Sequence, residues 1–316
     1  MNPRPAPRSI ADYLEQLHAC LEGQDPALIQ DAAYDAEEYL RAELAANKDK
    51  SEADVLELIA STYGAPDEVA AAYMDTEAKV RAALRTPSKA PNKAPPGALA
   101  RFFGVFTDPR AYMSLFFMFL AFATGLIYFI VSVVGVSLSV GLAVLIIGVP
   151  FFLMFIALTR VMSLVEGRIV EGLLGERMPR RPQHPGPAKG FWQRIGDMLG
   201  DSRTWTTLAY FVLMLPMGIV YFVIALVGTT LGGTLTAGAF VGLANALGVA
   251  TGDFQITSDL ETHIRPEWLA HGFSSPVGIV LLFAAGVLLL TLTLHLARFI
   301  GGCHGKFAKL MLVARD

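Results

Sequence analysis

Residues with the types and spacing to do chemistry are few in this sequence, and the first candidates are two histidines in one polar stretch. His263 and His271 lie among acidic residues that include Asp253, Asp259 and Glu261. Imidazole and carboxylate groups are common metal ligands, so a weak metal or ligand site is one interpretation. The two histidines are far apart in sequence, however, and no set of His and Cys residues has the spacing of a known zinc site. We therefore favour an ordinary polar loop, and we predict no metal and no cofactor.

Catalytic motifs are also missing. The sequence holds no HExxH, no GxSxG and no Walker loop, and titratable residues do not cluster, so we expect a protein that is not an enzyme. The candidates for ligand binding are aromatic or polar residues that could cover or line the mouth of a helical bundle. For two of them, which are tyrosines three residues after a glycine, helix packing is the favoured alternative. The predicted ligand-binding residues are Tyr128, Tyr221, Phe254, Asp259, His263 and Trp268.

Four long apolar stretches must position these residues. They cover about 112–134, 138–159, 205–230 and 276–297, and none contains Asp, Glu, Lys or Arg. About 20 apolar residues suffice to cross the hydrocarbon core of a bilayer as a helix. Hydrophobic residues make up 53% of the chain. We therefore predict an all-α fold with a four-span helical bundle in residues 99–316, and an extracytoplasmic loop at about 232–275.

The membrane segment contains an internal repeat. Residues 108–142 align without a gap with residues 201–235 at an offset of 93, and the second halves of the two copies align at an offset of 138. Two copies with the same topology predict parallel two-helix repeats related by a pseudo-twofold axis along the membrane normal. Amphipathic segments at the membrane interface are expected on each side of every repeat. Identical pairs include Gly125 and Gly218, Tyr128 and Tyr221, Gly135 and Gly228, and Arg160 and Arg298.

The distribution of basic residues predicts the orientation. The expected loop between the first two spans has no Lys or Arg, and the loop at about 232–275 has only Arg265. Loops rich in Lys and Arg stay in the cytoplasm, so both termini are expected in the cytoplasm. The basic residues between the second and third spans are Arg168, Arg177, Arg180, Arg181, Lys189, Arg194 and Arg203, and those of the tail include Arg298, Lys306 and Lys309.

A small helical domain precedes the membrane segment. Residues 1–8 form a Pro-rich tail, residues 9–85 have helical spacing of apolar residues, and residues 86–98 form a linker that contains Pro and Lys. Ser9 and Ser51 can cap helices, and Pro26 and Pro66 suit first turns. The pattern predicts four helices packed as a bundle.

This domain is strongly acidic. Such a surface repels phosphate backbones, so we expect no direct binding of nucleic acid. It could instead attract a basic partner, although a merely solvated face is an equally good interpretation. The acidic residues predicted to contact a partner are Glu37, Glu38, Asp67 and Glu68.

Two stretches resemble known families. Tyr13–Leu17 and the sequence Tyr63–Ala70, which contains Gly-x-Pro-x-x-Val-Ala, are similar to the HAAS-type helical signalling domain of bacterial membrane proteins over about residues 10–75. That family usually has Leu where this chain has Tyr63. The resemblance implies a signalling module whose partner is a cytoplasmic regulator, often of the helix-turn-helix type.

The membrane repeats resemble a second family. Paired spans with internal Gly and Tyr-Phe, followed by an exit that ends near Gly172–Gly175, are similar to the bacterial "putative sensor" transmembrane domain over about residues 99–312. The resemblance implies a sensor in the inner membrane of a bacterium. We expect it to detect a lipid, a small apolar ligand or the state of the envelope. Membrane lipid and a second copy of the chain are further candidate partners. A transporter or channel for lipid or apolar solutes is the alternative function.

Overall fold

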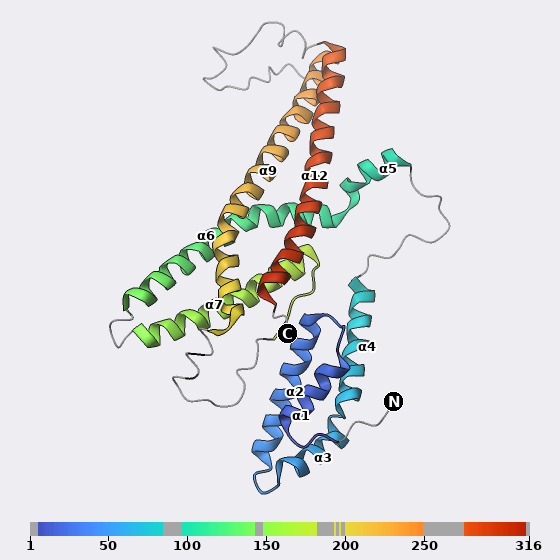
Figure 1. Ribbon diagram of the computed structural model, residues 1–316. Helices are drawn as coiled ribbons and strands as arrows, with labels where there is room; N and C mark the ends of the chain where they lie inside the picture. Colours follow the sequence, from blue (N-terminus) through green and yellow to red (C-terminus); the bar gives the residue numbers. More distant parts are fainter. Residues whose placement is uncertain are drawn as a thin grey trace. The chain divides into compact units, whose positions relative to one another are not determined.

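The computed structural model describes residues 6–84, 97–142, 148–181, 193, 196, 200–248 and 275–313 (Figure 1). The described residues form helices and turns without any strand, which confirms the all-α prediction for this part of the chain. In chain order the elements are α1 (Ile10–Cys20), α2 (Pro26–Ala46), α3 (Glu52–Thr62), α4 (Pro66–Leu84), α5 (Ala98–Phe103), the 3₁₀ helix η1 (Gly104–Thr107), α6 (Pro109–Leu142), α7 (Gly148–Leu174), α9 (Ser202–Ala246) and α12 (Pro276–Leu312).

The helices of the N-terminal domain begin where the capping residues predict. The Ser9 hydroxyl accepts a hydrogen bond from the Asp12 N–H at 3.1 Å, and Asp25 accepts one from the Ala27 N–H at 2.9 Å ahead of Pro26. Ser51 caps α3 in the same way. These side chains satisfy N–H groups that a helix N-terminus leaves without partners.

α1 to α4 pack around one apolar core. Leu17, Leu21, Leu40 and Ile59 are almost wholly buried in it. Tyr13 is buried beside them and its hydroxyl donates to the Gly64 carbonyl at 2.9 Å, which gives the polar end of the ring a partner. Gly64 has a φ of +113°, a conformation that glycine adopts without strain, and it lets the chain turn between α3 and α4.

Among the described residues, four helices are long and apolar enough to cross a membrane, namely α6, α7, α9 and α12. The prediction of four spans agrees with this, but several boundaries differ. α6 continues to Leu142 rather than ending near 134, and α7 begins at Gly148 rather than near 138. α9 continues to Ala246 rather than ending near 230, so residues 232–246 of the expected extracytoplasmic loop are helical.

Glycines lie close to the positions where α6 and α9 were expected to end. A Cβ at Gly232 would lie 2.8 Å from Leu290 Cγ, and a Cβ at Gly135 would collide with the Phe155 ring. Small residues of this kind let apolar helices approach each other closely. The glycines therefore make room for a neighbouring helix, and the helix that carries them does not end there.

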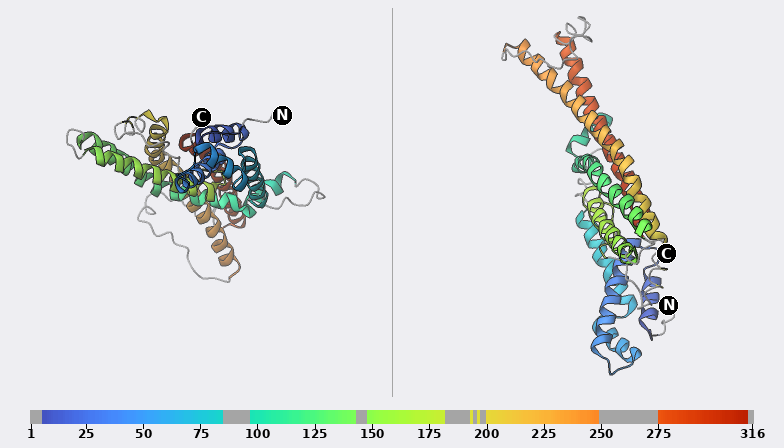
Figure 2. Two further views of the ribbon diagram at one scale, coloured as in Figure 1. Left: turned by 90° about the horizontal axis from the view of Figure 1, so that it is seen from below. Right: turned by 90° about the vertical axis from the view of Figure 1, so that its left-hand side faces the viewer.

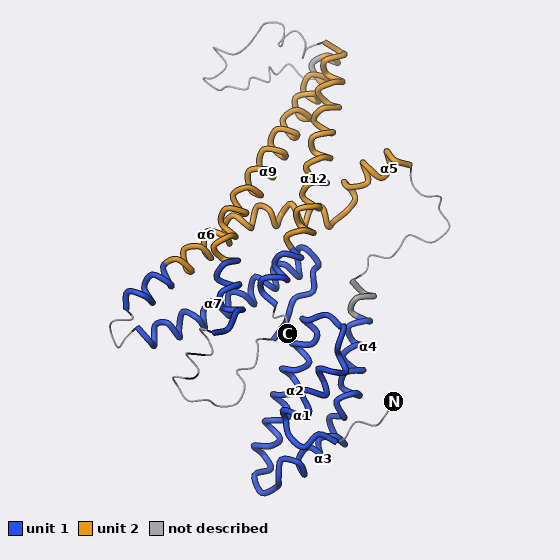
Figure 3. The backbone as a smooth tube through the Cα atoms, in the orientation of Figure 1, with its two compact units in different colours: residues 1–94, 134–210, 305–316 blue, residues 95–133, 211–304 orange. Residues whose placement is uncertain are grey.

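Contacts divide the chain into two compact units that do not follow chain order (Figure 3). Unit 1 contains residues 1–94, 134–210 and 305–316, and unit 2 contains residues 95–133 and 211–304. Each unit is described by itself below. Within unit 2, α9 and α12 lie side by side, as both Figure 1 and Figure 2 show.

Within unit 2, α6 and α9 touch through equivalent residues of the two repeat copies. A Cβ at Gly125 would lie 2.6 Å from the Met214 carbonyl oxygen, and one at Gly218 would collide with the Ala121 carbonyl. Ala121 and Met214 are themselves separated by the repeat offset of 93. The contact is thus reciprocal, as in an interface between two symmetry-related copies.

Two contacts between consecutive helices also lie at equivalent positions, as given by the alignment offsets of 93 and 138. Gly135 of α6 receives the Phe155 ring of α7 in unit 1, and Gly228 of α9 receives the Thr293 side chain of α12 in unit 2. Gly135 and Gly228 differ by 93, and Phe155 and Thr293 differ by 138. Each first helix therefore accepts the equivalent residue of its second helix.

We predict that Gly218→Ala destabilises the protein by about 2 kcal/mol, because the added methyl group meets backbone rather than a flexible side chain. For a chain of 316 residues that corresponds to a fall in Tm of about 3 °C. The measurement is thermal unfolding of the full chain in detergent. Gly233→Ala in the same helix is the control, since nothing lies within 4 Å of its Cβ position. Equal melting of the two variants would contradict the packing role.

Candidate functional site

A short basic segment follows α7 in unit 1. Gly175 has a φ of +74° and ends the helix, and residues 176–181 continue without regular structure. The Arg177 side chain is only 14% exposed. Its guanidinium contacts Asp31 of α2 at 2.8 Å and Glu77 of α4 at 3.3 Å. The segment thus holds two helices of the N-terminal domain at once.

The contacts between the basic segment 176–181 and the N-terminal domain form a charged interface, in which Asp31 of α2 accepts three hydrogen bonds. One of its carboxylate oxygens accepts the backbone N–H groups of Arg180 and Arg181 at 2.7 and 2.8 Å, and the other accepts the Arg177 guanidinium. Charge-assisted hydrogen bonds are about twice as strong as neutral ones. A carboxylate buried with three donors fixes both the position and the direction of the segment.

Arg181 adds a second ion pair one turn along α2. Its Nε lies 2.8 Å from Asp35 Oδ1, and its guanidinium carbon lies 5.7 Å from the centre of the Tyr34 ring. The other oxygen of Asp35 accepts the Tyr73 hydroxyl of α4 at 2.7 Å. Asp35 therefore joins the basic segment to the domain core.

The start of α2 makes further contacts with other parts of unit 1. Lys309 of α12 pairs with Asp25 at 2.6 Å, and its amine also lies 3.4 Å from Glu176. Gln30 donates to the Arg181 carbonyl at 2.7 Å and accepts from Arg203 of α9 at 3.2 Å. The interface therefore involves α2, α4, the basic segment, α9 and the end of α12.

Burial and charge act in opposite directions on Arg177. Burial alone would lower the pKa of its guanidinium, but the charges of Asp31, Glu77 and Glu171, with the hydrogen bond to Asp31, raise that pKa overall. The arginine is therefore always charged. Replacing one charged residue of the pairs between Arg177 and the acids Asp31 and Glu77 would leave a buried charge without its partner, a change that is strongly destabilising.

A second polar cluster lies inside the apolar helices. Glu166 of α7 is fully buried in unit 1 and accepts the Tyr210 hydroxyl at 2.7 Å. The equivalent of Glu166 at the offset of 138 is His304, which in unit 2 packs on Phe117 with ring centres 4.8 Å apart. Phe117 is the equivalent of Tyr210 at the offset of 93. The same contact thus occurs in both copies with different side chains.

The two predicted tyrosines lie in packed surroundings. Tyr128 is 5% exposed, and its ring lies 4.7 Å from that of Phe211. Tyr221 packs against the cluster of Met118, Ala225 and Ala297, and its hydroxyl lies 3.4 Å from His304 Nδ1. The other predicted ligand-binding residues, which are Phe254, Asp259, His263 and Trp268, lie outside the described residues.

The four acids predicted to contact a partner do not join the charged interface. Glu37 pairs with Arg41 in its own helix at 2.6 Å, and Glu68 accepts the Ala65 N–H at 3.1 Å. Glu38 and Asp67 are exposed. Their role in binding a partner stays a prediction.

The acids of the interface were missed in the sequence because they look like the rest of an acidic surface. One signal was present: Asp31 and Asp35 lie one turn apart on the side of α2 that also carries the buried Leu28 and Ala32. A charge on a largely buried helix face needs a partner. Arg177, Arg180 and Arg181 were noted only as indicators of orientation.

We predict that Asp31→Asn speeds amide hydrogen exchange at Arg180 and Arg181 by about tenfold, since it weakens charge-assisted hydrogen bonds worth about 1.5–3 kcal/mol. The measurement is hydrogen exchange of the full chain in detergent, followed by mass spectrometry of a peptide covering 176–181. Glu38→Gln on the same helix is the matched control and should change nothing. An unchanged rate in Asp31→Asn would exclude this role.

The interface should also weaken in alkali. Burial, the hydrogen bond to Asp35 and the charge of Asp35 raise the pKa of Tyr73 above its ordinary value. The folded state therefore favours neutral Tyr73, and its contribution to stability is complete below about pH 10 and is lost at higher pH. We expect the Tm of the full chain to fall between pH 9 and pH 11, and to fall less in Tyr73→Phe. An equal fall in both proteins would contradict this.

Comparison with known proteins agrees with the membrane part of the structure. No curated protein and no solved structure matches the chain. The model of the family described as "Putative sensor" matches residues 117–312, which include most of α6 and all of α7, α9 and α12. With this match over more than half of its length and its four apolar helices, the chain belongs to the "Putative sensor" family.

Proposed function

We propose that this protein is a multi-pass membrane sensor whose N-terminal helical domain is its output module. The domain binds reversibly to the basic segment 176–181, and a stimulus acting on the membrane helices shifts the balance between the bound and the released states. A ligand can shift such a balance only if it favours one of the two states. The family match and the four apolar helices support the membrane part of the proposal.

One observation carries the output part. Arg177 is the third residue beyond the end of α7 at Leu174. Its side chain reaches Asp31 and Glu77 of the N-terminal domain, which precede it in the sequence by 146 and 100 residues. A shift of the end of α7 therefore moves the group that holds the domain. Because Arg177 lies just beyond a membrane-capable helix, it is well placed to transmit a change in that helix.

The distribution of charge supports a cytoplasmic location for this interface. Arg177, Arg180 and Arg181 belong to the segment with the greatest number of basic residues, and such segments stay in the cytoplasm. The resemblance of residues 10–75 to HAAS-type domains favours the same side. We propose a bacterial inner membrane with both termini in the cytoplasm.

Release of the domain would uncover Asp31, Asp35 and Glu77 together. A cytoplasmic regulator with basic residues, for example of the helix-turn-helix type, could then occupy the surface that the basic segment leaves. In this scheme the basic segment and the regulator compete for one acidic surface. In this scheme, the state in which the domain is bound to the basic segment gives no output.

We predict that Arg177→Glu releases the domain and switches on the output without any stimulus, because it places an acid against Asp31 and Glu77. Two readouts are needed. Hydrogen exchange at residues 176–181 of the full chain reports release, and the transcript profile of native cells carrying the variant reports output.

The rescue variant is Arg177→Glu combined with Glu77→Arg, which conserves the charges of the interface and should restore part of the original state in both readouts. Glu38→Gln is the control for a change of surface charge. If Arg177→Glu releases the domain while the transcripts stay those of the wild type, the proposed output role is wrong.

A further inference from the structure

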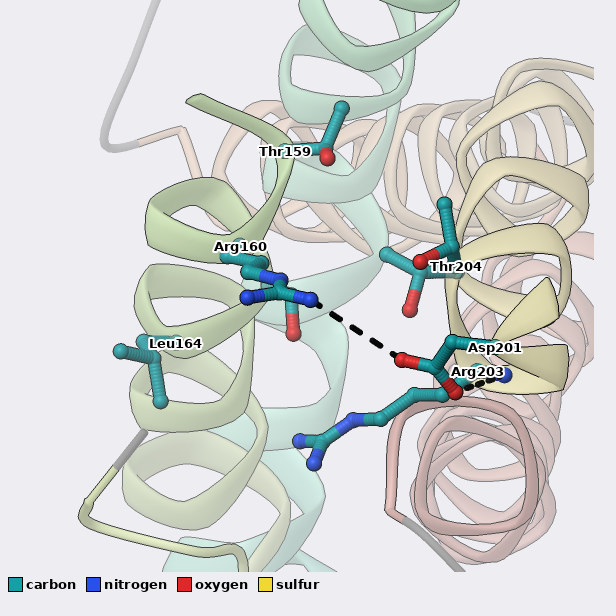
Figure 4. Close-up of a pocket in the computed structure, with 8 residues that line it drawn as sticks. Thr159, Arg160, Leu164, Asp201, Arg203 and Thr204 are labelled. Atoms are coloured by element: carbon teal, nitrogen blue, oxygen red, sulfur yellow. Dashed lines mark hydrogen bonds and ion pairs between the residues drawn. The ribbon is translucent and has the colours of Figure 1, made fainter. Parts of the chain in front are cut away.

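A small pocket lies between α7 and the start of α9 in unit 1 (Figure 4), and it shares Arg203 with the charged interface. Its volume is about 40 Å³. Since one water needs about 10–15 Å³ on this measure, the pocket holds about three waters, which is roughly the size of a phosphate group. It is lined chiefly by Arg160, Arg203, Asp201, Thr159, Ser163 and Thr204.

Two guanidinium groups extend into this space from different helices. Figure 4 shows Arg160 coming from α7 and Arg203 from α9, with Asp201 between them. Arg160 is 45% exposed and its Nη2 lies 4.0 Å from Asp201 Oδ2, too far for a hydrogen bond. With one acid and two arginines, the pocket carries one net positive charge.

The acid in the pocket, Asp201, already accepts a hydrogen bond from the backbone of α9. Asp201 Oδ1 accepts the Arg203 N–H at 3.0 Å and so caps the start of α9. Three hydroxyl residues complete the lining, and Thr159, Ser163 and Thr204 are each less than 10% exposed. The Thr159 hydroxyl donates to the Ile156 carbonyl at 2.8 Å within α7. The two guanidinium groups, with the hydroxyl groups of Ser163 and Thr204 beside them, are the donors that suit phosphate oxygens.

The equivalent residues of the other repeat copy are arranged differently. The equivalents of Arg160 and Asp201 are Arg298 and Asp108, which form a closed ion pair at 2.7 Å in unit 2. The equivalents of Thr159, Ser163 and Thr204 are Ala297, Gly301 and Ala111. One copy has thus kept the Arg–Asp pair with small apolar neighbours, and the other has an opened pair surrounded by hydroxyl groups.

The position of the pocket matches the level of lipid headgroups. The apolar part of α7 ends at Arg160, and the apolar part of α9 begins after Thr207. Trp205 is 54% exposed beside it, as is typical of residues at a membrane interface. Basic pockets between membrane helices on the cytoplasmic side bind anionic headgroups.

We propose that this pocket binds the phosphate of an anionic ligand, with Arg160 and Arg203 as its two charged donors. An anionic phospholipid and a soluble phosphate share this chemistry. Binding draws Arg203 away from Gln30, whose amide holds the Arg181 carbonyl of the charged interface at 2.7 Å. The effect on the interface rests on the function proposed above, whereas the binding itself does not.

The test uses the delipidated full chain in detergent, with binding of phosphatidylglycerol measured by native mass spectrometry and binding of inorganic phosphate and glycerol phosphate by calorimetry. Arg160→Gln and Arg203→Gln should each weaken binding about tenfold, the value of one charge-assisted contact. Thr204→Val, which keeps the shape of the side chain, should weaken it less. Arg298→Gln is the matched control in the other copy and should bind like the wild type.

Tight binding of phosphatidylglycerol alone would identify a lipid site, and equal binding of glycerol phosphate would identify a soluble ligand. Equal binding by Arg160→Gln, Arg203→Gln and Arg298→Gln, or no binding of any probe, would overturn the proposal. Hydrogen exchange at residues 176–181 is measured with and without the bound probe and should rise with it. If the probe binds through both arginines but hydrogen exchange at residues 176–181 does not rise, the link to the charged interface is refuted and the binding site itself is not. A failure of the proposed output role is a separate result, because it is measured by the transcripts.

Discussion

The arrangement of unit 1 depends on one buried carboxylate. Asp31 is 5% exposed and accepts two backbone N–H groups and a guanidinium, all from residues about 150 positions further along the chain. A buried charge without such partners would cost several kcal/mol. The carboxylate is therefore stable in this buried position only while the basic segment lies against it. Asp35, Asp25 and Gln30 extend the contact from the same helix.

Much of the fold could be predicted because its signals are local. Ser9, Ser51, Pro26 and Pro66 mark helix starts through hydrogen bonds within one turn. Apolar stretches of sufficient length predict spans directly. The boundaries of α6 and α9 were the exceptions, since both helices continue past glycines, Gly135 and Gly232, that make room for a neighbouring helix. Whether a glycine ends a helix or admits a neighbour depends on residues distant in sequence.

The candidate sites were less predictable for the same reason. Asp31 and Arg177 are ordinary surface residue types, and only tertiary structure brings them together. The pocket near Arg160 also joins residues from two helices. Even so, the repeat alignment contained part of the answer, because it placed Arg160 opposite Arg298 and Glu166 opposite His304. Positions where two copies of one pattern differ in chemistry were more informative than any single motif.

The reciprocal contact of Gly125 and Gly218 has a consequence for how such a protein can change. In a symmetric dimer of a two-helix chain, every substitution appears twice, and a new polar pocket would have to be tolerated at both equivalent places. Here the two copies share one polypeptide, so each can be altered alone. The Arg298–Asp108 ion pair can therefore stay closed while its counterpart, Arg160 and Asp201, opens. The stability that the closed pair contributes offsets the free energy that is lost where the other pair opens.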